Sequence, residues 1–171
     1  NNASQKLVAL KELVRQLDNL SHALFYCSPE QIDGVCQLLG WDLGLLIGRF
    51  TAEEPNDLRQ QLLSDFDHGV LQALVAMKCL DEGVDVPSTR TAFILASSSN
   101  PREFIQRRGR ILRRAPGKSE ATIYDFIAVP PQGWNSGSPS TEKGIIEHEL
   151  NRFREFADSA RNKHQALDVI W

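Results

Sequence analysis

The sequence is poor in cysteine and has no long apolar run. Its three cysteines, Cys27, Cys36 and Cys79, are odd in number and form no C-x-x-C pair. This argues against a disulfide framework or a thiolate zinc site and fits a reducing compartment, so we expect no metal site and cysteines buried as small apolar residues. No apolar run approaches the roughly 20 residues that span a bilayer, and the first residues lack the layout of a signal peptide. We therefore expect a soluble cytoplasmic protein that contacts no membrane.

The sequence also lacks the two signatures that hold a nucleoside triphosphate and its Mg²⁺. A P-loop reads G-x-x-x-x-G-K-[ST], whereas APGKS at 115–119 has Leu112 in place of the first glycine and precedes a strand. LDEG at 80–83 imitates an acidic Mg²⁺ box, but the preceding residues 77–79, Met-Lys-Cys, do not continue an apolar strand. We predict that this chain alone neither binds ATP tightly nor hydrolyses it.

The bulk composition is that of an ordinary globular domain. The 171 residues are 42% hydrophobic and 24% charged, with a formal net charge of −3. A chain of this length can bury a core without disulfides or a metal. Disordered and fibrous classes are excluded.

Short apolar runs alternate with helical patterns along the chain. The predicted strands are HALFYC (22–27), LGLLIG (43–48), QALVAM (72–77), TAFILA (91–96) and EATIYDFIAV (120–129). Continuous apolar runs of this length are typical of parallel strands covered by helices on both faces. The pattern predicts an α/β fold with a parallel sheet of about five strands, whose ligands bind at the carboxyl ends of the strands.

Helix boundaries carry their own signals. Apolar residues recur at helical spacing over 4–19. Ser28 is predicted to be the N-cap of the next helix, with Gln31 at the capping-box position and Gly40 as its stop, and Thr51 with Glu54 predicts another capping box. PPQGWNSGSPS (130–140) has the composition of a flexible loop, and a long helix is predicted over 141–165.

Positive charge gathers in NPREFIQRRGRILRRAPGK (100–118). On a helix, Gln106, Arg110 and Arg113 share one stripe, beside an apolar stripe of Ile105, Gly109 and Leu112. Two converging guanidinium groups repel each other unless an anion lies between them, and guanidinium suits bidentate phosphate binding. The alternative is a solvated basic face paired with acids elsewhere on the surface.

The same segment, Q-R-R-G-R-x-x-R, resembles motif VI of superfamily 2 helicases and translocases. Residues 74–113 are similar to the motif V to motif VI segment of that superfamily, and HALFYCSPEQID resembles motif IV. The resemblance covers residues 5–130 and is closest to double-stranded-DNA translocases related to the transcription-repair helicase and to restriction-type subunits. It implies a RecA-like three-layer sandwich with a mainly parallel sheet of five to six strands. The predicted domains are 1–130, RecA-like; 131–140, a flexible loop; and 141–171, a C-terminal helix that packs on or extends from the domain.

The resemblance also implies residue roles in ATP hydrolysis. Arg113 resembles the arginine finger that stabilises charge on the γ-phosphate, and Arg110 its companion phosphate ligand. Gln106 resembles the amide that links phosphate, water and arginine. Gly83 and Asp85 resemble the motif V pair, with the aspartate near the ribose or holding an arginine of motif VI. The alternatives are a glycine needed only for backbone geometry and a turn acid before a proline.

Nucleic-acid contacts are implied at Ser28, Arg49 and Lys78. Ser28 and Arg49 stand where such domains touch the backbone of one strand, although a cap and a surface charge are alternative interpretations. Met77 departs from the family pattern, which often has a threonine that contacts a phosphate, and the adjacent Lys78 is the candidate substitute. Trp41 could stack on a base, but we interpret it as packing between a helix and the next strand.

These features predict the second motor domain of an ATP-dependent superfamily 2 DNA helicase or translocase. ATP and Mg²⁺ would be bound mainly by an N-terminal RecA-like ATPase domain of the same protein, with DNA as the other partner. One alternative is a non-catalytic RecA-like module that binds nucleic acid or protein. Another is half of an RNA helicase.

Overall fold

The computed structural model describes residues 2–77, 86–96, 117–127 and 140–168. The chain divides into two compact units, Asn1–Phe126 and Ile127–Trp171. The predicted division at 130 and 140 stays a prediction.

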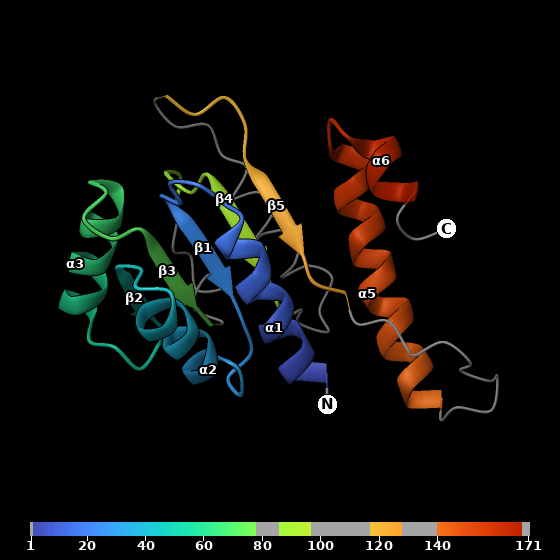
Figure 1. Ribbon diagram of the computed structural model, residues 1–171, viewed down its shortest axis with the longest axis horizontal. Coiled ribbons are helices and arrows are strands. Elements are labelled where there is room, and N and C mark those ends of the chain that lie inside the picture. Colours follow the sequence, from blue (N-terminus) through green and yellow to red (C-terminus); the bar gives the residue numbers. More distant parts are fainter. Residues whose placement is uncertain (1, 78–85, 97–116, 128–139, 169–171) are drawn as a thin grey trace. The chain divides into compact units, whose positions relative to one another are not determined.

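The first unit is built on one sheet of five parallel strands (Figure 1). The strands are β1 (Ala23–Tyr26), β2 (Ile47–Phe50), β3 (Ala73–Ala76), β4 (Thr91–Ile94) and β5 (Thr122–Asp125). Their order across the sheet is β2-β3-β1-β4-β5, and Ala23 of β1 pairs in register with Ala73 of β3 and Thr91 of β4. The predicted α/β class and parallel sheet are confirmed.

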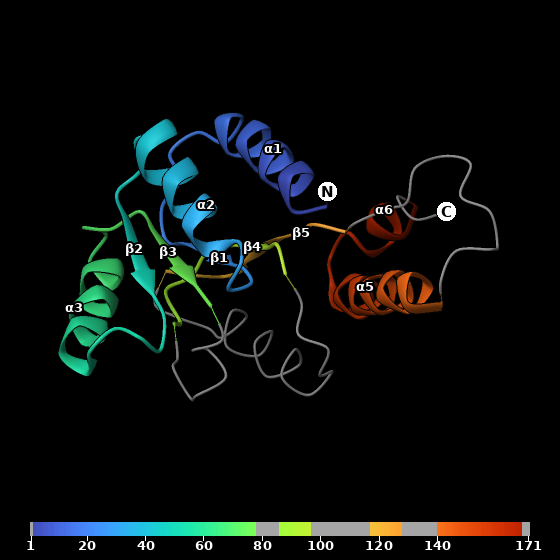
Figure 2. The ribbon, with the colours of Figure 1, turned by 90° about the horizontal axis from the view of Figure 1, so that it is seen from below.

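Helices cover both faces of this sheet (Figure 2). One face carries α1 (Asn2–Arg15), α2 (Ile32–Cys36) and a π-helical turn, η1 (Gln37–Asp42), and the other carries α3 (Asn56–Asp67). Successive strand residues alternate between the two cores, since Phe25 lies in the α1 and α2 core whereas Leu24 lies in the α3 core. Apolar residues on both faces explain why the strands read as continuous apolar runs. The three-layer, RecA-like architecture is confirmed.

Three aromatic rings stack across three neighbouring strands. Phe25 of β1 and Phe93 of β4 have ring centroids 4.3 Å apart and planes 3° from parallel. Tyr124 of β5 follows at 5.1 Å from Phe93, with an interplanar angle of 19°. Phe25 and Phe93 are fully buried, so the stack lies in the core.

The boundary between α2 and β2 differs from the prediction. Gly40 does not stop the helix, which continues to Asp42 through η1, where the Leu43 N–H donates to the Leu38 carbonyl at 3.0 Å. Glycine inside a helix costs only about 1 kcal/mol, and the burial of Leu38 and Leu39 outweighs that cost. The strand therefore occupies 47–50 instead of 43–48.

Both predicted capping boxes form their side-chain bond but do not begin a helix. The Ser28 N–H donates to Gln31 Oε1 at 3.1 Å, yet α2 begins at Ile32 with Gln31 as its N-cap residue. The prediction that Ser28 is the N-cap was wrong. The Thr51 N–H donates to Glu54 Oε2 at 2.5 Å, yet α3 begins at Asn56 after Pro55. These bonds close the turns that lead into the helices.

The second unit contains α5 (Ser140–Ser159) and α6 (Lys163–Asp168) instead of one long helix. The Ser159 hydroxyl donates to the carbonyls of Glu155 and Phe156 at 3.3 and 3.2 Å, a local bond that competes with helix continuation. No helix among the described residues has the length and apolar character needed to cross a bilayer.

Candidate functional site

The carboxyl ends of the five parallel strands meet at one edge of the sheet. Ser28 follows β1, and Arg49 is the third residue of β2. Because β3 lies between β1 and β2, the ends of these two strands are roughly 10 Å apart. The structure thus brings Ser28 and Arg49 to the same edge, as predicted, and no hydrogen bond joins them within the described part of the chain.

The other predicted site residues belong to the segments that follow β3 and β4, the two strands beside β1 in the sheet. Residue 77 is the last described after β3, and residue 96 is the last described after β4. Lying outside the described residues are Lys78, Gly83, Asp85, Gln106, Arg110 and Arg113. Their roles stay predictions.

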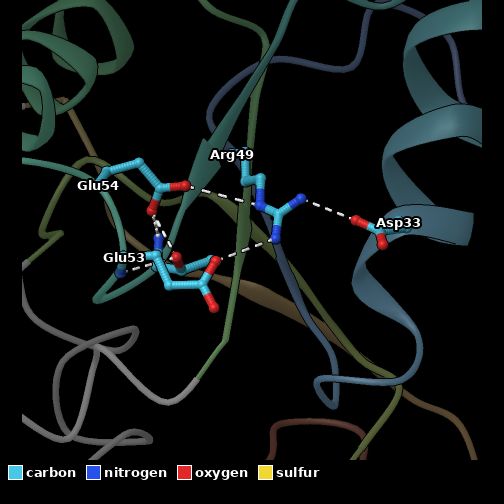
Figure 3. A network of polar contacts seen from close by, with 5 residues as sticks. Asp33, Arg49, Glu53 and Glu54 are labelled. Carbon is cyan, nitrogen blue, oxygen red and sulfur yellow. Dashed lines mark hydrogen bonds and ion pairs between the residues drawn. The ribbon is translucent and has the colours of Figure 1, made fainter.

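Arg49 lies within reach of three carboxylates (Figure 3). Its Nη1 contacts Asp33 Oδ1 at 2.7 Å, its Nη2 contacts Glu53 Oε2 at 3.5 Å, and its Nε lies 3.6 Å from Glu54 Oε1. One guanidinium faces three carboxylates, which leaves the group with a net charge of −2. A phosphate that binds Arg49 competes with these acids for the N–H groups of the guanidinium.

Glu54 ties this group to the backbone. Its Oε2 accepts hydrogen bonds from the Thr51 N–H at 2.5 Å and from the Thr51 hydroxyl at 2.6 Å, while its Oε1 faces Arg49. Thr51 is fully buried. Since partly exposed ion pairs each contribute only about 0.2–1 kcal/mol, the network positions the 51–54 turn against β2 more than it stabilises the fold.

The side chain of Ser28 differs from that of Arg49, which is held by ion pairs. Its backbone N–H is bonded to Gln31, but its side chain makes no capping bond to α2. Among the described residues its hydroxyl takes part in no hydrogen bond. A half-buried hydroxyl at the carboxyl edge is suited to a phosphate oxygen.

Two further residues mark this edge. Met77, where the family often has a threonine, is half-buried and packs against the core on the α1 and α2 face, so it serves the core. Lys6 of α1, which sequence reasoning missed, is nearly buried and its Nζ donates to the Leu95 carbonyl at 3.0 Å. It thereby fixes the chain just beyond β4. Its place on an amphipathic helix gave no signal for this contact.

A groove of about 540 Å³ lies beside the Arg49 group. It is lined by Asp33, Cys36, Gln37, Gly40, Trp41, Ile47 and Arg49. Trp41 is 87% exposed, so the interpretation as a packing residue was wrong. Leu38 and Leu39 face the core, and this leaves Trp41 on the outer side of η1.

The cysteines fit their expected apolar role where they are described. Cys27 is buried in the core, and Cys36 is partly buried beside the groove. Burial raises the pKa of the Cys36 thiol, although the positive charge of Arg49 opposes the rise. Cys79 lies outside the described residues. No cluster of metal-binding side chains occurs in the described ranges.

Residues 5–115 match the family described as the helicase conserved C-terminal domain. The chain belongs to this family. The all-parallel sheet of five strands agrees with this family match. The chain is a helicase C-terminal domain of superfamily 2.

Named relatives of this helicase C-terminal domain act on DNA. It is 29% identical over 153 residues to the "DNA 3'-5' translocase XPB2" of Sulfurisphaera tokodaii, covering 90% of this chain and 30% of that protein. It is 30% identical over 100 residues to the "DNA 3'-5' helicase XPB" of Kineococcus radiotolerans, covering 58% of this chain and 17% of that protein. The chain thus spans less than a third of these relatives.

Solved structures agree on the fold. The Pyrococcus furiosus Hef helicase domain is 26% identical with a TM-score of 0.54, covering 75% of this chain and 26% of that chain. The C-terminal domain of the DEAD-box protein Dbp5 superposes with a TM-score of 0.69 at 17% identity, covering 92% of this chain and 81% of that chain. At this identity the Dbp5 likeness concerns the fold alone.

Proposed function

We propose that this helicase C-terminal domain is the second motor domain of an ATP-dependent DNA translocase or helicase. The match of residues 5–115 to the helicase family carries the proposal, and the relatives named as DNA translocase and helicase favour DNA over RNA. ATP and Mg²⁺ would be held mainly by an N-terminal RecA-like domain, because this sequence has neither a P-loop nor an acidic Mg²⁺ box.

The ATP-facing residues of this domain would act by charge and position. Arg113 would stabilise negative charge on the γ-phosphoryl group during transfer, with Arg110 as a second phosphate ligand and Gln106 orienting water. Gly83 and Asp85 would form the motif V pair, with Asp85 either near the nucleotide ribose or holding an arginine of motif VI. In phosphoryl transfer most catalysis comes from such positioning and electrostatic stabilisation. Arginines on a second domain reach the nucleotide only when the domains close, which couples hydrolysis to movement.

The nucleic-acid track would use the carboxyl edge near β1 and β2. The hydroxyl of Ser28 supports this proposal because it makes no cap bond, and Lys78 would follow β3 at the same edge. Arg49 would contribute in competition with the carboxylates that it contacts.

The test is the variant Arg113→Ala in the full-length protein. We expect kcat for ATP to fall about 10³- to 10⁵-fold, the range that arginine fingers contribute, while ATP binding changes little. Arg114→Ala, an adjacent arginine outside the predicted stripe, is the matched control and should retain activity. The isolated chain should show no ATPase activity. Unchanged turnover in Arg113→Ala would refute the finger role, and an encoding gene without an upstream P-loop would favour the non-catalytic binding module.

A further inference from the structure

Apart from Arg49, the residues that line the groove have a mixed chemistry that the proposed motor function does not use. Its floor and walls are apolar at Cys36, Gly40 and Ile47, and an exposed indole, Trp41, stands at one end. At the other end Asp33, whose side chain is 84% exposed, contacts Arg49. A tryptophan this exposed gains little from folding, and it lies on a π-helical turn, a feature frequent at functional sites.

The helix geometry gives the groove a direction and a length. Asp33, Gln37 and Trp41 follow one another at four-residue steps and lie along one side of α2 and η1. Eight residues of helix rise roughly 12 Å, which is the reach of about four residues of extended peptide. Ile47 and Arg49 of β2, which are two residues apart, also line the groove.

The charge around the groove selects a cationic occupant. Asp33, Glu53 and Glu54 outnumber the single guanidinium of Arg49, for a net charge of −2. At the Trp41 end, Asp42 is paired with Lys11 at 3.1 Å, so that end adds no positive charge. This field is less favourable to a phosphate than to a basic side chain, which the surplus acids attract. Arginine stacks on tryptophan and pairs with acids, so a segment with two basic residues can place one on the indole of Trp41 and the other near Asp33.

We propose that this groove is a docking site for an extended, arginine-bearing segment of a partner protein, with an arginine stacked on Trp41 and basic charge facing Asp33 and Glu53. The apolar lining accepts the intervening aliphatic side chains of that segment. A nucleic-acid base stacked on Trp41 is the competing occupant, and the net negative charge argues against it.

The probe is the peptide acetyl-Leu-Arg-Leu-Arg-amide, compared with a peptide in which citrulline replaces each arginine. Citrulline keeps the shape of arginine and removes its charge. Binding is followed by the indole N–H resonances in ¹⁵N-labelled protein, and Trp41→Phe identifies the Trp41 signal among the three tryptophans. We expect the Trp41 signal to shift saturably with the arginine peptide and the citrulline peptide to bind about tenfold more weakly.

Matched variants separate the groove from the rest of the surface. Trp41→Ala should abolish the peptide effect as measured on neighbouring backbone amides, and Asp33→Asn should weaken it. Leu58→Ala and Asp57→Asn, which change an exposed apolar residue and an acid on α3, should leave it unchanged. No saturable shift, or equal binding of the citrulline peptide, would overturn the proposal. A shift of Trp41 by a thymidine oligonucleotide in place of the peptide would overturn it in favour of base stacking.

Discussion

Arg49 can serve the proposed nucleic-acid track in two ways that a single mutation does not distinguish. Its guanidinium either contacts a DNA phosphate or merely neutralises the acids around it. Arg49→Gln weakens DNA binding in both cases, because it either removes a contact or leaves three uncompensated carboxylates beside the track. The informative perturbation is Arg49→Gln combined with Asp33→Asn.

The size of the effect follows from the geometry. Asp33 Oδ1 lies 2.7 Å from Arg49 Nη1, so a phosphate that binds Arg49 would lie a few ångströms from Asp33. Two unit charges 4 Å apart interact by about 1 kcal/mol in water, and salt reduces this value. We therefore expect Asp33→Asn alone to tighten DNA binding roughly two- to fivefold.

The double-mutant cycle separates the two roles. If Arg49 contacts a phosphate, Arg49→Gln lowers the DNA affinity more in the Asp33→Asn background than in the wild type, because the guanidinium is freer to bind DNA there. If Arg49 only neutralises Asp33, Arg49→Gln lowers the DNA affinity less in that background. We expect the first result.

The assay is fluorescence anisotropy of a labelled duplex, titrated with this chain at several salt concentrations. Loss of a phosphate contact lowers the slope of log K against log[salt] by about 0.9, whereas loss of a neutralising charge changes affinity without removing a contact. Asp57→Asn on α3, an acid that is not part of the Arg49 group, controls for net charge. A salt slope that Arg49→Gln leaves unchanged in both backgrounds would refute a phosphate contact.

Two further predictions concern β2 and the groove. A methyl group at Gly48 would meet side-chain carbons of Leu62, Leu71 and Leu74 at 2.8–3.0 Å, so Gly48→Ala should lower the free energy of unfolding by about 1–3 kcal/mol in urea denaturation. Gly40→Ala, whose methyl group would have its nearest contact at 3.5 Å, should not lower it, since alanine is also the better helix former, and an equal loss of stability would contradict the crowding argument. Because burial raises the pKa of Cys36, its alkylation by iodoacetamide should be slower than that of a free thiol near pH 8 and should speed up as pH rises above the ordinary thiol range. Arg49→Gln should slow it further, since Arg49 lowers that pKa, and peptide mapping by mass spectrometry measures the rate.

Sequence reasoning captured the sheet because its signal is local and strong. β1 and β3 are apolar at every position and β4 is apolar after Thr91, and that pattern requires cover on both faces. It misplaced β2 because Leu43 and Leu45 are as apolar as strand residues, although they pack against the core from the connection that follows η1. Pairing of Ile47 with Ala73 sets the register of the strand, and such pairing between distant segments is not visible in a local pattern.

The candidate site was predictable to a smaller extent. The Thr51 and Glu54 bond could be predicted from their spacing, and it forms. The approach of Asp33 to Arg49 depends on how α2 crosses the sheet, over 16 residues of sequence, so spacing alone gave no signal for it. Exposure of Trp41 could have been predicted from the burial of Leu38 and Leu39 only if the helix had been known to continue past Gly40.

The stacked rings of Phe25, Phe93 and Tyr124 have a mechanical consequence. They join β1, β4 and β5 side by side, and around the buried rings of Phe25 and Phe93 sliding one ring past another would open a void. The three strands therefore move as one stiff plate. β4 and β5 are also the two strands that the arginine-rich part of the sequence connects, so the points where that part of the chain begins and ends belong to the same plate.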